Sequence, residues 1–198
     1  MRLNVIVAVS ENWGIGKCGG LPWKLKSVSL AAISMVKDMA FFKTVTTKAK
    51  SGLTNAVIMG RVTWESIPEN FKPLKDRINV VVSSTLSQTP SGVQVVPNLN
   101  AAINLLHNDE FSSIVDEIFV IGGYSLYKEV LKQTIYPVRI YCTHILNEVD
   151  CDIYFPKVNW GKLKKIDLPD IPVDTFMENG LTYKFCVYDV PSEYLFDL

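Results

Sequence analysis

The chain has few of the residues that build metal centres or disulfide scaffolds. Its 198 residues contain two isolated histidines, and its cysteines form no C-x-x-C pair. The four cysteines are widely spread: Cys18, Cys142, Cys151 and Cys186. This inventory argues against a structural zinc site and against a disulfide framework. We therefore expect free thiols in a reducing cytosol and no bound metal.

An excess of charge of either sign is also lacking. Lys plus Arg and Asp plus Glu each count 20, so nothing favours nucleic acid or an anionic membrane surface as a partner. No apolar run approaches the ~20 residues needed to cross a bilayer. The apolar stretch after Met1-Arg2 is too short for a signal peptide and is interpreted as a strand. We expect a soluble, cytoplasmic protein, and we take it to be a monomer.

Apolar runs rich in valine and isoleucine recur along the chain, as is typical of strands buried on both faces of a parallel sheet. Strands are expected at Leu3–Val9, Ala56–Met59, Ile78–Val82, Val93–Val96, Ile118–Ile121, Ile135–Ile145 and Leu181–Val190. Helices are expected in a segment ending near Thr47 and at Val62–Ile67, Leu99–His107 and Ser125–Lys132, with Asn98 or Asn100 capping the third. This order predicts one α/β domain over residues 1–198. It would have a mostly parallel central sheet, flanking helices and antiparallel strands at the C-terminal edge.

A glycine-rich segment from Ser10 to Lys26, SENWGIGKCGGLPWKLK, follows the first expected strand. Its glycines satisfy the dinucleotide fingerprint G-x-G-x-x-G, but that fingerprint requires a helix to open within the glycines. Here Pro22 follows closely, and a proline pushes the residue before it out of the helical region. We therefore interpret the segment as a mobile flap over a small-molecule pocket, with Trp23 at the pocket mouth.

Two later segments combine a buried strand with a turn suited to anions. In VIMGRVTWESIP the strand ends at Gly60, and backbone amides, the Thr63 hydroxyl and the Arg61 guanidinium follow at once. In IFVIGGYSLYKE a strand runs into Gly122-Gly123 and a helix begins within two residues, so free amides and a partial positive charge gather there. The alternatives are a solvated surface arginine in the first segment and a simple tight turn in the second.

Two further segments carry isolated charges. Arg77 precedes the strand at Ile78–Val82 and, beside an apolar wall made by Leu74, could clamp a carboxylate; pairing with Asp76 or with another surface acid is the alternative. Asp150 and Asp152 lie on one loop, without the further ligands that a metal site requires. We interpret that loop as solvated.

Five blocks, in order from about Leu3 to Val190, resemble the dihydrofolate reductase family: WGIG with LPW, MGRVTWESIP, PLKDRINVVVSS, IGGYSLY, and THI with DCDIYFP. The resemblance implies NADPH-dependent reduction of 7,8-dihydrofolate to 5,6,7,8-tetrahydrofolate, with hydride transfer to C6 and protonation at N5. It also implies that antifolate-type inhibitors bind. No thymidylate synthase segment is expected.

The resemblance further implies which residues bind the cofactor. The serine pair would bind the 2′-phosphate and favour NADPH over NADH, the glycine pair would form a cis peptide bond, and Tyr127 would lie near the nicotinamide ring. The implied cofactor-binding residues are Ala8, Ile15, Gly19, Gly60, Arg61, Val62, Thr63, Ser83, Ser84, Gly122, Gly123, Tyr124, Ser125, Leu126 and Tyr127.

For the substrate, the resemblance implies backbone carbonyls of Ile6 and Ile121 at the pterin, Arg77 on the α-carboxylate of the glutamyl tail, and Thr143 bonded to a buried acid. The implied substrate-binding residues are Ile6, Val7, Met39, Phe42, Ser66, Ile67, Leu74, Arg77, Ile121 and Thr143.

The catalytic acid is not where the family has it. The family places it five or six residues after the Pro-Trp tryptophan, where this chain has Val28 and Ser29. The expected continuation appears later as DMAFFKTVT, starting at Asp38, as if residues 28–37 were inserted after a helix-capping Ser27. We assign the acid to Asp38 and a water-organising role to Trp23; the alternative is that Asp38 is a surface helix residue.

The insert has two possible conformations. It either loops out or lengthens the following helix by about 15 Å. We expect the loop, because a straight extension would cross the pocket mouth or displace Trp23. Two rival functions stay open: a folate- or NADPH-binding protein disabled by the insert, and a reductase of another pterin or of a pyrimidine.

Overall fold

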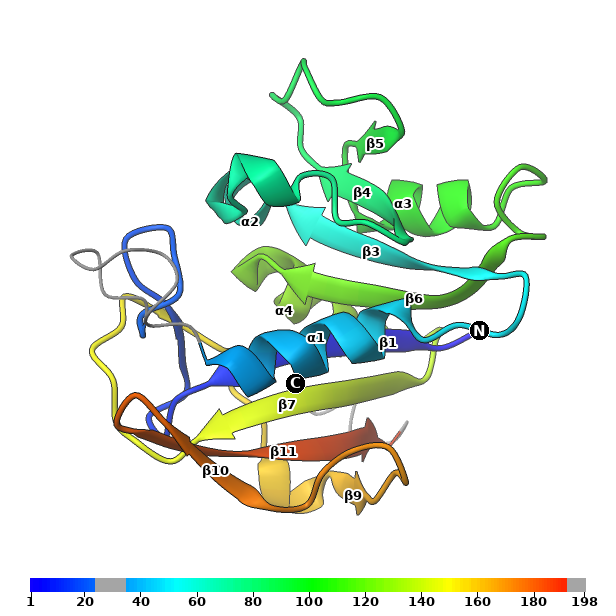
Figure 1. Ribbon diagram of the computed structural model, residues 1–198. Coiled ribbons are helices and arrows are strands. Elements are labelled where there is room, and N and C mark those ends of the chain that lie inside the picture. The colour runs from blue at the N-terminus through cyan, green and yellow to red at the C-terminus, as the bar shows by residue number, and fades with distance from the viewer. Residues whose placement is uncertain (24–34, 192–198) are drawn as a thin grey trace.

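The computed structural model describes residues 1–23 and 35–191 (Figure 1). A nine-stranded sheet has the order β10-β11-β7-β1-β6-β3-β4-β5, with β9 paired to β11. The parallel strands are β1 (Leu3–Val9), β3 (Thr54–Gly60), β4 (Arg77–Val82), β5 (Val93–Val96), β6 (Val115–Gly122) and β7 (Val138–Ile145). The antiparallel strands at one edge are β9 (Lys164–Ile166), β10 (Thr175–Glu178) and β11 (Leu181–Val190). The predicted α/β architecture is confirmed.

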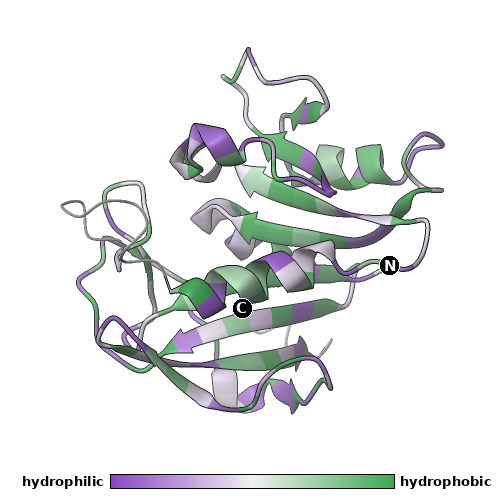
Figure 2. Ribbon diagram, viewed as in Figure 1, coloured by the Kyte–Doolittle hydropathy of each residue, from purple (hydrophilic) through white to green (hydrophobic). Residues whose placement is uncertain are grey.

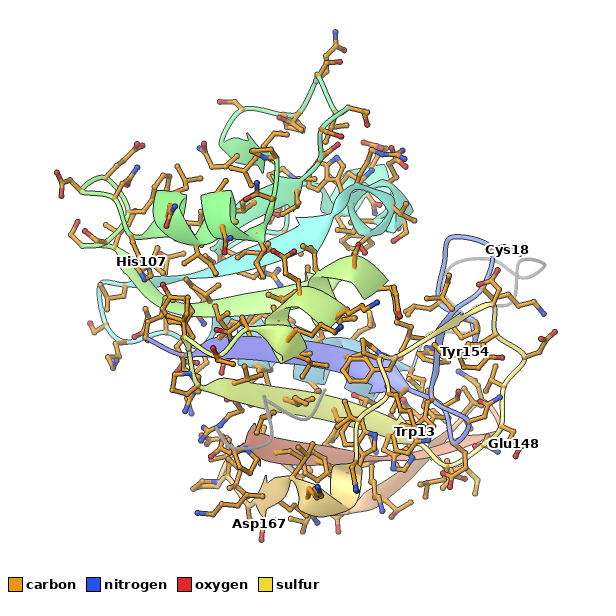
Figure 3. The ribbon with its side chains drawn as sticks, turned by 180° about the vertical axis from the view of Figure 1, so that it is seen from behind. Trp13, Cys18, His107, Glu148, Tyr154 and Asp167 are labelled. Atoms are coloured by element: carbon orange, nitrogen blue, oxygen red, sulfur yellow. The ribbon has the colours of Figure 1, made fainter. Side chains whose placement is uncertain are left out.

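Helices cover both faces of this sheet. In Figure 1, α1 (Val36–Thr47) crosses in front of the sheet, and Figure 3 shows α3 (Leu99–Leu106) and α4 (Tyr124–Lys132) on the opposite face. The short helix α2 (Arg61–Ser66) directly follows β3. Side chains therefore form two apolar clusters, one between the sheet and α1 and one between the sheet and α3 and α4.

The central strands are buried on both faces because each is apolar at nearly every position. In β3, Val57 faces the cluster under α1 and Ile58 the cluster under α3 and α4, and both are fully buried. Figure 2 shows hydrophobic residues along the central strands. Burial of this kind contributes about 25 cal/mol per Å² of apolar surface, so the core stabilises the sheet from both sides.

Local signals set several element boundaries. The Asn98 side chain accepts a hydrogen bond from the Ala101 amide at 2.8 Å, so Asn98 is the cap of α3. Strand β7 begins at Val138 rather than at the predicted Ile135, because the Gln133 side chain holds residues 135 and 136 in a turn. The short strands β2 (Gly14–Gly16), β8 (Ile153–Tyr154), β9 and β10 are not predicted by the sequence analysis, because they lack the apolar, valine-rich composition that marks the equally short β5.

Helix α1 begins within the predicted insert. Val36 and Lys37 form its start, so Asp38 is the third helical residue and not the first. Met35 occupies the N-cap position with extended backbone angles (φ −66°, ψ 95°), so the helix does not run straight back into the insert. The described helix thus includes only Val36 and Lys37 of the insert; residues 28–34 and the predicted cap Ser27, and with them the choice between loop and helix, lie outside the described residues.

The carboxyl ends of the parallel strands meet at one edge of the sheet. At that edge β1 leads into the glycine-rich segment, β3 into α2 and β6 into α4, as the left side of Figure 1 shows. In open α/β sheets, ligands bind in the crevice at this edge. Within the described ranges, no helix is long and apolar enough to cross a membrane.

Candidate active site

Asp38 is a buried acid and not a surface helix residue. Its exposed fraction is 5%. It projects from the first turn of α1 toward β7, where the Thr143 hydroxyl donates a hydrogen bond of 2.6 Å to its Oδ1. Thr143 is 2% exposed, so both partners are shielded from solvent. A carboxyl group this close to a buried hydroxyl has a fixed position and a strong hydrogen bond.

Trp23 ends the described part of the glycine-rich segment with its indole buried. Its Nε1–H has no hydrogen-bond partner among the described residues. A buried donor left without a partner costs about 1–3 kcal/mol, and buried donors of this kind are satisfied by water or a ligand. The indole N–H is therefore available to a water molecule or a ligand.

Half of the predicted substrate-binding residues lie in the apolar cluster on the α1 side of the sheet. They share this cluster with Trp23: Ile6, Phe42, Ile67, Leu74 and Ile121. Ala8, predicted to bind the cofactor, packs against the same cluster. Val7 is an exception, because its side chain packs into the cluster on the α3 and α4 side. Only its backbone could contact a substrate on the α1 side. Met39 and Ser66 are exposed, so they lie at the rim and not in the interior.

Arg77 is half-buried and pairs with no carboxylate among the described residues. Its Nη1 donates to the Thr46 hydroxyl of α1 at 2.8 Å, and its Nε donates to the Lys75 carbonyl at 2.9 Å. The guanidinium carbon lies 5.8 Å from the centre of the Phe42 ring. Burial lowers the pKa of Arg77, and the charge of Asp76 opposes this shift without forming an ion pair. The predicted alternative, pairing with Asp76, is wrong, and the guanidinium keeps donors for an anion.

The two glycine turns touch each other. A side-chain carbon at Gly60, between β3 and α2, would lie 3.7 Å from the Gly123 Cα. Gly123 is the N-cap of α4 and has φ +103°, a conformation that glycine adopts without strain. The predicted cis bond between Gly122 and Gly123 is wrong: in the described ranges the cis bond is Lys72–Pro73. The positive φ of Gly123 turns the chain into α4 instead.

Tyr127 joins this turn to β1. Its hydroxyl donates to the Ile6 carbonyl at 2.9 Å, and its side chain is 4% exposed. Burial raises the pKa of Tyr127 well above its ordinary value, so the hydroxyl remains a donor. Leu126 is also buried, whereas Tyr124 and Ser125 are exposed at the start of α4. The first amides of α4 have no helical acceptors and are available to an anion.

Substitution of Gly122 by alanine is expected to destabilise the fold by about 1–3 kcal/mol through overpacking. The added carbon would lie 2.5 Å from both Cγ2 and Oγ1 of Thr63. Urea denaturation of the Gly122→Ala and Gly60→Ala variants checks this. The Gly60 variant is the control, since its added carbon meets nothing nearer than 3.7 Å; equal denaturation midpoints would contradict the expectation.

Arg61, Ser83 and Ser84 lie side by side at the strand ends. Gly60 pairs with Val82 in the sheet, so Arg61 and Ser83 each follow a paired residue. Arg61 is exposed and ion-paired to Glu65 at 2.8 Å, and the Ser83 hydroxyl accepts from the amides of Thr85 and Leu86. Val62 and Ser84 are exposed beside them.

The glycine-rich segment, whose described part Ser10–Trp23 we call the flap, is docked on residues 147–155. Strand β2 pairs with β8, the Cys18 amide donates to Asp152 Oδ2 at 2.7 Å, and Lys17 is ion-paired with Asp150. Asp150 and Asp152 therefore bind the flap instead of being merely solvated. Ile15 is half-buried, whereas Gly19 is exposed with φ +77°. In Figure 3 the labelled Cys18 and Trp13 mark the two ends of this docked stretch.

Trp13 anchors the base of the flap. Its indole stacks between the rings of Trp160, at 4.9 Å, and His144, at 5.5 Å. Its φ of +64° is rare for a residue with a side chain. The stack and the backbone bond from Phe155 to the Trp13 carbonyl at 2.8 Å hold this conformation.

Three groups of polar contacts were not predicted from the sequence: Thr46 with Arg77, Asp152 with Cys18, and Glu178 with Tyr183 and Lys37. Apart from Glu178 and Tyr183, which lie five positions apart on one hairpin, only the chain's folding brings these partners together, since they are far apart in the sequence. No group of three metal-binding side chains forms within residues 1–23 and 35–191. All four cysteines are free.

Comparison with known proteins is consistent with this geometry. A family model described as dihydrofolate reductase matches residues 2–190. Dihydrofolate reductase of Schistosoma mansoni is 79% identical over 193 residues, covering 98% of each chain. The Bos taurus dihydrofolate reductase is 40% identical and covers 94% of this chain and 96% of its own. A solved structure of the S. mansoni enzyme superimposes with a TM-score of 0.87 at 78% identity, covering 96% of this chain and 99% of that one.

Proposed function

The chain belongs to the dihydrofolate reductase family, and from this premise we propose that it reduces 7,8-dihydrofolate to 5,6,7,8-tetrahydrofolate with NADPH as the reductant. The observation that carries the proposal is the buried Asp38 carboxyl, hydrogen-bonded to Thr143 at the edge of the sheet where the parallel strands end. A C=N bond is reduced by a hydride at carbon and a proton at nitrogen. A single acid in a dry pocket is the protein's minimal chemical contribution.

In this proposal Asp38 binds the N3 and 2-amino edge of the pterin and favours protonation of N5, either directly or through a water held at the Trp23 indole. Thr143 fixes the carboxyl, and the carbonyls of Ile6 and Ile121 accept hydrogen bonds from the pterin. The Ile6 carbonyl already accepts from Tyr127, but a carbonyl oxygen has a second lone pair. Val7, Met39, Phe42, Ser66, Ile67 and Leu74 complete the proposed substrate pocket.

The glycine turns fit the phosphates of a dinucleotide. Gly60 and Gly123 approach each other with no side chain between them, and the free amides of α4 and Thr63 border the same place. Bound NADPH would supply the hydride for C6. We assign its pyrophosphate to Gly122, Gly123 and the start of α4, its 2′-phosphate to Arg61, Ser83 and Ser84, and its nicotinamide to the surroundings of Ala8, Ile15, Gly19 and Tyr127.

The assay of the full chain separates this proposal from its rivals. Loss of NADPH absorbance on adding dihydrofolate is expected, whereas tight cofactor binding without turnover would indicate a disabled binder. Asp38 is buried, and the backbone at Met35, just before its helix, is extended. Both observations favour an active enzyme over a binding protein disabled by the insert. The uncommitted guanidinium of Arg77 speaks against a reductase of tail-less substrates.

Substitution of Arg61 by leucine is expected to raise the KM for NADPH about tenfold and leave the KM for NADH unchanged, since one charge-assisted hydrogen bond contributes about 1.5–3 kcal/mol. Only NADPH carries the 2′-phosphate. Glu65→Gln is the matched control, because it removes the ion-pair partner of Arg61 while keeping the guanidinium. Steady-state kinetics with both cofactors measures the preference, and equal losses for NADPH and NADH would refute the assignment.

We also propose that the protein works as a monomer in the cytoplasm. Its free cysteines support a reducing compartment. Antifolates that present a cationic amino-substituted ring are expected to compete with dihydrofolate, because such a ring can pair with the Asp38 carboxylate.

A further inference from the structure

Helix α1, which carries Asp38, begins without a side-chain cap from its own N-cap residue. The N-cap residue is Met35, whose side chain has no oxygen to accept a hydrogen bond from the first amides of the helix. The first helical bond runs from the Met39 amide to the Met35 carbonyl at 3.0 Å. The amides between them need acceptors from outside the helix.

One acceptor comes from the C-terminal hairpin formed by β10 and β11. The Lys37 amide donates to Glu178 Oε2 at 3.3 Å, across 141 positions in the sequence. The Lys37 ammonium lies 4.4 Å from the centre of the Phe176 ring on the same strand as Glu178. A carboxylate at a helix N-terminus also interacts favourably with the helix dipole. Glu178 therefore supplies a capping acceptor to the second residue of α1.

Tyr183 holds Glu178 in this position. Its hydroxyl donates to the same Glu178 Oε2 at 2.6 Å, and its residue is fully buried. The ring lies edge-on to Phe185 at 5.7 Å and tilted against Phe176 at 5.8 Å. Burial, reinforced by Glu178, raises the pKa of Tyr183 above its ordinary value, so its hydroxyl stays protonated and keeps donating.

The same hairpin fixes the next turn of α1. Phe185 stacks on Phe41 with the ring centres 4.1 Å apart. Phe185 is also the sheet partner of Thr143, the residue that donates to Asp38. The first two turns of α1 are thus tied to β7 and to the hairpin at three positions, Lys37, Asp38 and Phe41.

We propose that Glu178, held by Tyr183, is a positioning residue for the reduction: it caps α1 from across the sheet and so sets the Asp38 carboxyl against Thr143. The proposal rests on the proposed function. It assigns part of the positioning of Asp38 to a residue from across the sheet, in a chain whose spacing after Trp23 differs from that of the family.

Three variants and a control test the cap. Glu178→Ala removes the acceptor, Glu178→Gln keeps a carbonyl oxygen at the same reach, and Tyr183→Phe removes only the hydroxyl. Asp174→Ala is the matched control, because Asp174 is an exposed acid just before β10. The measurements are kcat, the KM for NADPH, and amide hydrogen exchange in the first turn of α1.

Glu178→Ala is expected to lower kcat about tenfold, since displacing a catalytic group by ~1 Å can cost up to 10²-fold. The KM for NADPH should not change, and amide exchange in the first turn of α1 should accelerate. Tyr183→Phe should show a smaller loss in the same direction. Glu178→Gln should restore most of kcat and of the exchange protection, and Asp174→Ala should match the wild-type chain.

Unchanged exchange or unchanged kcat in Glu178→Ala would overturn the proposal. So would a Glu178→Gln variant as impaired as Glu178→Ala, because the cap requires only an oxygen acceptor. Hydrogen exchange needs no turnover, so the cap is tested separately from the activity. A wild-type chain without turnover but with the expected exchange pattern would refute the proposed function and leave the cap supported.

Discussion

Replacing Asp38 with asparagine is expected to lower kcat/KM for dihydrofolate by about 10²–10⁴-fold, the usual contribution of a positioned acid or base. Asparagine preserves the shape of the side chain, and its carbonyl oxygen can still accept from Thr143. It cannot supply a proton or pair with a protonated pterin. Steady-state kinetics at neutral pH, with NADPH saturating, measures the loss.

Two controls make this result specific to Asp38. Asp170→Asn removes an exposed acid that is ion-paired with Lys48, and its activity should match that of the wild-type chain. Binding of NADPH to Asp38→Asn should also be unchanged, because the glycine turns are formed by other strands. Near wild-type turnover of Asp38→Asn would mean that the proton comes from another group.

Replacing Arg77 with leucine is expected to raise the KM for dihydrofolate by about 10–100-fold, since one charge-assisted hydrogen bond contributes about 1.5–3 kcal/mol. The guanidinium is half-buried and lies over Phe42, with hydrogen bonds only to Thr46 and the Lys75 carbonyl among the described residues. The guanidinium that would bind a carboxylate of the glutamyl tail is therefore partly desolvated and oriented before the substrate arrives. The rise in KM caused by Arg77→Leu should exceed the loss of kcat, because the tail is remote from the reacting atoms.

A tail-less dihydropterin is the test substrate for this clamp. The KM for this substrate should be similar for Arg77→Leu and the wild-type chain. Lys75→Leu, which removes an exposed cation two residues away, is the control, and its KM for both substrates should equal that of the wild-type chain. If the KM of Arg77→Leu rises equally for dihydrofolate and for the tail-less pterin, Arg77 supports the local fold and is not a clamp.

Much of the fold could be predicted because its signals are local. The valine-rich runs that became β1, β3, β4 and β6 are apolar at consecutive positions, and only a sheet covered on both faces buries such runs. The Asn98 cap depends on a bond three residues away. The start of α4 is likewise a local signal: the N-cap Gly123 has a positive φ, and the glycine pair before the helix allows that conformation.

The remaining features depend on pairs of residues that are far apart in the sequence. Arg77 suggested an anion site, but Thr46, which orients it, is 31 positions away. The start of α1 could not be derived from its flanks, because its cap is Glu178 and its anchor Phe185. The predicted cis bond between Gly122 and Gly123 was carried over from the family and did not come from the residues themselves; in the described ranges Gly123 has instead a positive φ.

The sheet edge at which the parallel strands end has two unlike sides. On one side, backbone atoms of Gly60 and Gly123 lie close together at the starts of α2 and α4. On the other side, the flap is held by the β2–β8 pair, by the stacked ring of Trp13 and by the exposed acids Asp150 and Asp152. Salt screens exposed ion pairs, so we expect the contact between Lys17 and Asp150, and with it the docking of the flap, to weaken as the salt concentration rises.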